Sequence, residues 1–220
     1  MAEILEAGLL QAIPHGFSTA VGLDVGEILP GAPLVRLKQV HSNTVYHVAE
    51  PWRERPEGDG LCTDRPGLVL GIVTADCAPV LFADPEAGVV GAAHAGWRGA
   101  RSGVLENTVE AMISLGARRD LIRAAIGPTI AQASYEVDHQ FREQFGDGDE
   151  QFFAVGRPGR YQFDLPAYVA HRLQAAGVLR IEDLAEDTYT QPDRFFSFRR
   201  ATHRAEADEG RQLSVIAVPA

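Results

Sequence analysis

The sequence is poor in cysteine, in basic residues and in long hydrophobic runs. Its two cysteines lack the spacing of a disulfide framework, which favours a reducing, cytoplasmic compartment. It has 20 lysines and arginines against 30 aspartates and glutamates, and this net charge of -10 argues against nucleic acid or an anionic membrane as the main partner. No apolar run reaches the roughly 18 residues of a membrane helix, and the acidic N-terminus lacks the basic n-region of a signal peptide. We therefore expect a cytoplasmic protein without a nucleic-acid, membrane or obligate protein partner.

What is present suffices for one folded domain over residues 1–220, because 45% of the residues are hydrophobic. Apolar and β-branched runs predict strands at 33–49 (with a break at 41–43), 67–75, 78–83, 88–94, 121–127, 194–200 and 211–218. Apolar residues at helical spacing predict helices at 101–116, 136–145 and 164–177, the last capped by Asp164 and closed by Gly177. This mixture, with an antiparallel hairpin, indicates an α+β fold and not a regular doubly wound sheet.

The hairpin places a cysteine opposite a histidine. If "DPEA" (84–87) is a four-residue loop, the register that pairs Ala83 with Gly88 also pairs Cys77 with His94. Their Cβ atoms would lie about 4.5–5.5 Å apart on one face, provided that Pro79 takes a non-hydrogen-bonded position. Two such side chains can share a metal ion or form a thiolate–imidazole pair, although each residue type alone is more often structural.

A catalytic zinc site commonly has three protein ligands. The candidates for the third ligand are His15, His41, His47, His139, His171 and His203. Among these, His41 is the best placed, since it lies where a strand breaks into "HSN", close to Gln39. After His94, the glycine-flanked "GWRG" containing Arg98 leads into the predicted helix and suits an anionic ligand.

Seven segments, taken together, resemble one known family. They follow in order along most of the chain: "LKQVHSNTV", "DGLCTD", "TADCAPVLFAD", "GAAHAGWRGA", "AIGPTIAQASYEV", "FDLPAY" and "RFFSFRR". The ordered set is similar to the YfiH-type proteins, which are also labelled laccase-domain or polyphenol-oxidase proteins and are described as purine nucleoside phosphorylases. The resemblance implies a zinc ion held by His41, Cys77 and His94. It also implies a four-layer α/β/β/α sandwich of mixed sheets, akin to the catalytic domain of the cytotoxic necrotising factors.

The same resemblance implies a small-molecule substrate. Family members are credited with phosphorolysis of adenosine, inosine, guanosine and methylthioadenosine and with deamination of adenosine, so the expected ligands are a purine nucleoside and phosphate. Bacterial members are also linked to the editing of a peptidoglycan precursor. We expect Cys77, His94 and Arg98 to be catalytic and Gln39, Asn43 and Arg98 to bind substrate. The chain departs from the family pattern at Ala20, where an arginine usually follows "HGFST", and in lacking a cysteine before "RFFSFRR".

The laccase label can be tested by counting ligands. A multicopper oxidase needs about ten histidines, several of them in H-x-H pairs, whereas this chain has seven and no such pair. One zinc is therefore favoured, and a single copper, but not a multicopper centre, is compatible with the ligands. Asp59, Asp64 and Asp76 are the candidate acid/base carboxylates, and Cys62 is expected to be a buried small hydrophobe without a catalytic role.

Two other functions stay open. In a metal-free cysteine hydrolase, Cys77 would be the nucleophile and His94 the base. In a non-catalytic protein, the same residues would bind a nucleotide-like ligand or a partner without turnover.

Overall fold

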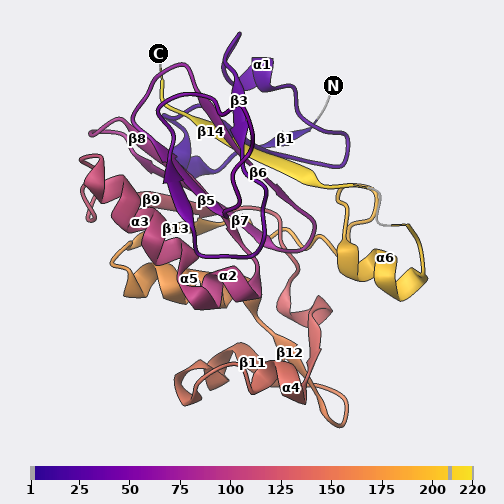
Figure 1. Ribbon diagram of the computed structural model, residues 1–220. Coiled ribbons are helices and arrows are strands. Elements are labelled where there is room, and N and C mark those ends of the chain that lie inside the picture. The colour runs from indigo at the N-terminus through magenta and orange to yellow at the C-terminus, as the bar shows by residue number, and fades with distance from the viewer. Residues whose placement is uncertain (1–2, 208–209, 220) are drawn as a thin grey trace.

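Two large mixed β-sheets stack face to face in the computed structural model, which describes residues 3–207 and 210–219 (Figure 1). The five-stranded sheet has the order β1 (Ile4–Leu5), β2 (His15–Ser18), β14 (Gln212–Ala217), β6 (Val69–Thr74) and β3 (Leu34–Arg36). The six-stranded sheet has the order β13 (Arg180–Asp183), β9 (Arg123–Ile126), β7 (Ala78–Asp84), β8 (Val89–Ala95), β5 (Gly60–Thr63) and β4 (Val45–His47). Each sheet contains both parallel and antiparallel pairs, which confirms the expected mixed α+β fold.

The core has three apolar layers. Side chains such as Leu70, Leu81 and Ile216 fill the space between the two sheets. The opposite face of the six-stranded sheet is covered by α2 (Trp97–Ser102), α3 (Val104–Ser114) and α5 (Leu165–Ala175) (Figure 1). On the outer face of the five-stranded sheet, α1 (Val25–Ile28) is a helix of only four residues. Strands β7 and β8 are buried along their whole length, which explains why they read as continuous apolar runs.

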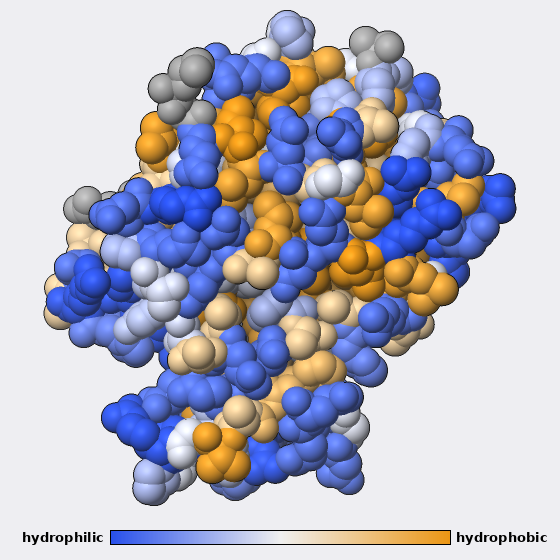
Figure 2. Space-filling model, turned by 180° about the vertical axis from the view of Figure 1, so that it is seen from behind, coloured by the Kyte–Doolittle hydropathy of each residue, from blue (hydrophilic) through white to orange (hydrophobic). Residues whose placement is uncertain are grey.

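A third, small sheet forms a lobe that projects from the main body (Figures 1 and 2). It consists of β10 (Glu136–Asp138), β12 (Arg160–Phe163) and β11 (Phe153–Val155), with α4 (His139–Arg142) beside it. The helix predicted over 136–145 is therefore mostly wrong: its first three residues pair with β12, and Asp138 caps a helix of only four residues. The step of four that suggested a long helix instead places Phe141 and Phe145 in an aromatic cluster around Phe163. Short 3₁₀ helices lie at Gly8–Leu10, Gln132–Ser134 and Asp147–Phe152.

The segment 194–200 is also not the predicted strand. Ser197 caps α6 (Phe198–Arg204) by accepting a hydrogen bond from the backbone N–H of Arg200. The buried Arg200 guanidinium donates to backbone carbonyls, including that of Phe195, and so holds the preceding residues in a loop.

The other helices agree with the sequence. The helix expected over 101–116 corresponds to α3. The preceding residues, expected as a loop, instead form α2, and Gly103 in a left-handed conformation separates the two helices. Asp164 caps α5 as predicted, by accepting from the backbone N–H of Ala167. Among the described residues, we find no helix with the length and apolar character needed to span a membrane.

Candidate metal centre

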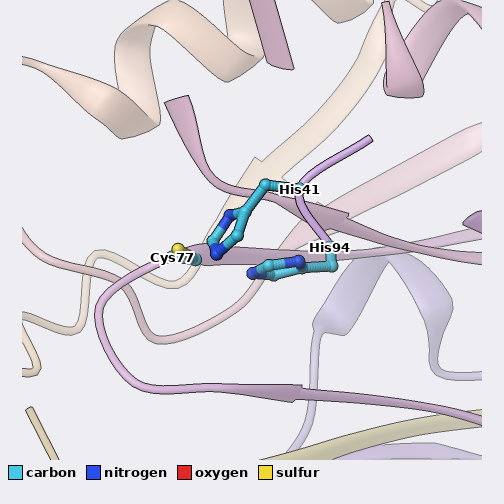
Figure 3. Close-up of side chains that lie close together, drawn as sticks. All are labelled: His41, Cys77 and His94. Atoms are coloured by element: carbon cyan, nitrogen blue, oxygen red, sulfur yellow. The ribbon is translucent and has the colours of Figure 1, made fainter. Parts of the chain in front are cut away.

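Three side chains meet where the chain crosses between the two large sheets. His41 lies between β3 and β4 and Cys77 between β6 and β7, so each follows a strand of one sheet and precedes a strand of the other. His94 comes from the end of β8. The three side chains point toward one another (Figure 3), and their donor atoms all lie within 4.8 Å of one another. Within the described residues, this is the only group of three or more His, Cys, Asp or Glu side chains that lie close enough together to hold a metal ion.

The hairpin register differs from the prediction by two residues. Asp84 pairs with Val89, which leaves residues 85–88 as the loop, and His94 pairs with Pro79 instead of Cys77. Because side chains alternate with a period of two, this shift keeps Cys77 and His94 on the same side, and the two side chains still meet. The backbone N–H of His94 donates to the backbone carbonyl of Asp59, the residue before β5, so Pro79 occupies the expected non-hydrogen-bonded position.

A fully buried carboxylate, Asp59, holds two of the three ligand residues. One of its oxygens accepts from His94 Nδ1 at 2.7 Å and from the backbone N–H of His41 at 3.0 Å. The other oxygen accepts from the backbone N–H groups of Val40 and Ser42 and from the Ser42 hydroxyl. These bonds wrap the 40–42 backbone around the carboxylate and fix His41 in its left-handed conformation (φ 60°).

The charges of the site are strongly coupled. Burial opposes ionisation of Cys77, but hydrogen bonds from His41 and His94 prevail and lower its pKa to about 6. Burial likewise opposes protonation of His94, but hydrogen bonds to Asp59 and Cys77 raise its pKa to about 9. The pKa of Asp59 is lowered to about 2, because hydrogen bonds from His94 and Ser42 outweigh its burial. Without metal, the site therefore favours a thiolate, which is the form of cysteine that binds metals.

The residues fit a metal ion. Since Asp59 accepts the Nδ1 proton of His94, the Nε2 atom of that ring is the one left for a metal, an arrangement common in metalloproteins. Gly96 makes room for the other two ligands, because a Cβ atom there would lie only 2.8 Å from both Cys77 Sγ and His41 Nδ1. Donors on one tetrahedral zinc lie about 3.5 Å apart at bond lengths of about 2.0–2.3 Å, so small rotations would bring the three donors into one coordination sphere.

The three ligand residues open onto a cavity of about 600 Å³. Three arginines (Arg98, Arg199 and Arg211) and three aromatic residues (Trp97, Tyr135 and Phe198) also line it. The one carboxylate in the lining, Asp76, has both oxygens engaged, by the Thr188 hydroxyl and by the backbone N–H of Arg199. The cavity is thus cationic and aromatic in a chain that is acidic as a whole.

Not all the residues expected to bind substrate face this cavity. Arg98 lines it, with its guanidinium 4.7 Å from the centre of the Trp97 ring. Gln39 lines it as well, but its amide both donates to and accepts from the backbone of Val73. Asn43 is exposed, donates to the backbone carbonyl of Ser102 and lies outside the residues that line the cavity.

Two of the other residues singled out in the sequence lie apart from the cavity. Asp64 contacts His47 and Arg65. Cys62 is completely buried, and burial together with the charge of Asp64 raises the pKa of its thiol to about 12.

The cavity also contains three residues that were not predicted to belong to the site. Tyr135, Phe198 and Arg199 line it, and all three belong to the family-like segments "AIGPTIAQASYEV" and "RFFSFRR". The resemblance to the family therefore included these residues. The strand predicted at 194–200 did not place Phe198 and Arg199 at the cavity, which they reach at the start of α6. Asp76, one of the candidate acid/base carboxylates, adopts a left-handed conformation (φ 84°) and lines the cavity.

Comparison with known proteins agrees with the geometry. The family model described as multi-copper polyphenol oxidoreductase laccase matches residues 25–219. The chain belongs to this family. It is 41% identical over 184 residues to a purine nucleoside phosphorylase of Rickettsia conorii, covering 82% of this chain and 76% of that one. It is 42% identical over 186 residues to a purine nucleoside phosphorylase of Deinococcus radiodurans, covering 84% and 70%.

Solved structures share the fold over nearly the whole chain. Bacillus licheniformis hypothetical protein YfiH superposes with a TM-score of 0.86 at 27% identity, covering 98% of this chain and 96% of that one. YlmD from Geobacillus stearothermophilus superposes with a TM-score of 0.84 at 27% identity, covering 97% and 94%. The family description names a multi-copper enzyme, but this member's seven histidines include no H-x-H pair, and the described residues contain a single three-ligand site.

Proposed function

We propose that the protein is a zinc-dependent purine nucleoside phosphorylase with its metal on His41, Cys77 and His94. The observation that carries this proposal is the opening of the three ligand residues onto the cationic, aromatic cavity. The names of the relatives that are 41% and 42% identical support the reaction class. Two imidazoles and a thiolate form a borderline-soft ligand set, which suits zinc and leaves a coordination position for a ligand.

The lining of the cavity fits both reactants. Phe198, which lines the cavity and is 54% exposed, offers an aromatic face on which a purine base can stack. Arg98 offers a charge-assisted contact to phosphate. The substrates that we propose are adenosine, inosine, guanosine and methylthioadenosine, whose glycosidic bond is cleaved by phosphate. We propose that a single domain over residues 1–220 catalyses this reaction in the cytoplasm.

The protein's own residues prepare the reaction. Zinc bound here would act as a Lewis acid toward an oxygen of phosphate or water. Asp59 keeps the proton of His94 at Nδ1 and fixes the orientation of that ring. Arg98 binds and orients phosphate beside the ligands, and Phe198 holds the base. Deamination is a different reaction: water activated at the same site would attack C6 of adenosine and release ammonia, which would require the base and not the ribose to lie beside the metal ligands.

One observation favours a second candidate function. Cys77 has two imidazole neighbours and a lowered pKa, as an activated nucleophile would have. A metal-free cysteine hydrolase, of the kind that could edit a peptidoglycan precursor, would use Cys77 as nucleophile and His94 as base. Ligand binding without turnover is the remaining alternative.

Product analysis on adenosine separates these functions. The phosphorylase produces adenine and ribose 1-phosphate only when phosphate is present, and the deaminase produces inosine with or without it. Neither product, at any zinc loading, would contradict the proposed function. Turnover that persists after complete removal of metal would favour the cysteine hydrolase.

A further inference from the structure

Two arginines of the cavity lack the carboxylate partners that many other arginines have. Arg157 and Arg194, for example, contact glutamates at 2.8 Å or less. By contrast, neither Arg98 nor Arg199 has a carboxylate within salt-bridge distance in the described part of the chain (3–207 and 210–219), although acidic residues outnumber basic ones by 30 to 20. Two guanidinium groups without counter-ions in one cavity indicate a place for an anionic ligand.

Arg199 is held so that much of its guanidinium remains available. Its backbone N–H donates to Asp76 at 2.7 Å, which anchors the first turn of α6. Its guanidinium carbon lies 5.0 Å from the centre of the Tyr135 ring, and one terminal nitrogen donates to the backbone carbonyl of Glu136. Its other guanidinium nitrogens have no acceptor among the described residues.

Tyr135 brings a neutral donor to the same place. Its ring is fixed edge-on against Phe141 and Phe163, each with a centroid distance of 5.9 Å, and it lines the cavity. Its hydroxyl group has no hydrogen-bond partner among the described residues. Burial and the charge of Cys77 raise the pKa of the phenol, while Arg199 and Arg98 act in the opposite direction. The hydroxyl therefore stays protonated, within electrostatic reach of both arginines and of a metal ligand.

We propose that Arg199 and the Tyr135 hydroxyl, together with Arg98, form the binding site for a phosphate group beside the metal ligands. Two guanidinium groups match the double charge of a phosphate, and the phenol supplies a further donor to one of its oxygens. This inference rests on the proposed function, because it specifies which residues bind the phosphate. The phosphate has two sources: free inorganic phosphate, or the phosphate of a nucleoside monophosphate.

Calorimetric titrations of inorganic phosphate and of adenosine monophosphate test the site directly. The proteins are the zinc-loaded wild type, Arg199→Gln, Tyr135→Phe and the control Arg101→Gln, which removes an exposed arginine of α2 outside the cavity lining. We expect Arg199→Gln to weaken phosphate binding about 10- to 100-fold, and Tyr135→Phe to weaken it about three- to tenfold. Arg101→Gln should bind like the wild type. In kinetics, the first two variants should raise the KM for phosphate and leave the KM for nucleoside within about twofold.

The outcomes separate this inference from the proposed function. A wild type that binds phosphate through Arg199 and Tyr135 but does not cleave nucleosides overturns the function and retains the site. A wild type that cleaves nucleosides while both variants keep wild-type phosphate affinity overturns the site. Binding of adenosine monophosphate alone, lost in both variants, identifies the nucleotide as the source, and binding of neither ligand contradicts the inference. If Arg199→Gln unfolds, Tyr135→Phe, which keeps the ring, and Arg199→Lys are titrated instead.

Discussion

Replacing Asp59 by asparagine should disable the metal site without removing any of its ligands. The carboxylate accepts five hydrogen bonds, from His94, from Ser42 Oγ and from three successive backbone N–H groups. Asparagine has only one acceptor oxygen, and its NH₂ group would face N–H or O–H donors that the second carboxylate oxygen accepts in the wild type. We therefore expect the 40–42 segment and the His94 ring to lose their fixed orientation together.

The magnitude follows from the pKa and the unmatched donors. Hydrogen bonding lowers the pKa of Asp59 from 3.8 to about 2, which corresponds to about 2 kcal/mol of folding free energy at neutral pH. Since the pKa is depressed in the folded state, this stabilisation is present above about pH 4 and disappears as the pH falls toward 2. Each buried donor left unmatched adds about 1–3 kcal/mol. We expect Asp59→Asn to cost about 3–5 kcal/mol at pH 7 and to weaken metal binding about 10- to 100-fold.

Denaturant unfolding of the metal-free protein and competitive zinc titration measure the two effects. Asp64→Asn is the matched control, because this carboxylate lies in the same "DGLCTD" segment but contacts His47 and Arg65 at the surface. The control should change the unfolding free energy by less than about 1 kcal/mol and leave zinc affinity unaltered. Wild-type stability and zinc affinity in Asp59→Asn would refute the role that we assign to this carboxylate.

Three further substitutions separate metal, phosphate and base. Cys62→Ala should keep most activity, because this thiol is buried in the core away from the cavity; a loss like that of Cys77→Ala would show that Cys62 takes part in the reaction. Arg98→Ala should keep its zinc, and its phosphorolysis rate should fall by an amount equivalent to about 1.5–3 kcal/mol, with a smaller fall in the deamination rate. An equal fall in both rates, or loss of zinc, would show that Arg98 has a structural role. Phe198→Ala should raise the KM for nucleoside about 5- to 100-fold with little effect on folding, since Phe198 is 54% exposed; an unchanged KM places the base elsewhere.

Local patterns in the sequence predicted the central hairpin but not its register. Strands β7 and β8 are apolar apart from Asp84 and His94 near their ends, so their existence followed from composition. The register depended on whether Asp84 belongs to the loop or to the strand, and "DPEA" suits both. In the structure Asp84 ends β7 and accepts hydrogen bonds from the backbone N–H groups of Glu86 and Ala87, while Gly88 takes the left-handed position.

The rest of the site depends on contacts between distant segments. His41 and Cys77 meet because two separate connections cross between the sheets at the same place. The resemblance to the family indicated this complete ligand set, whereas the spacing of residues alone did not. In the sequence Asp59 is one of several loop carboxylates. Its role follows only from its hydrogen bond to His94, which is 35 residues away along the chain. The aromatic segment "FFSF" is typical of a strand, whereas the Ser197 cap makes its last residue, Phe198, the first residue of a helix at the cavity.

Metal content is the most direct test of the account. Protein purified without added metal is analysed by inductively coupled plasma mass spectrometry, then stripped and titrated with zinc, in parallel with Cys77→Ala and Cys62→Ala. We predict about one zinc per chain in the wild type and in Cys62→Ala, and none held by Cys77→Ala, because a single site with three ligands depends on each of them. Stoichiometric zinc retained by Cys77→Ala, or full activity of the wild type without metal, would contradict the central claim.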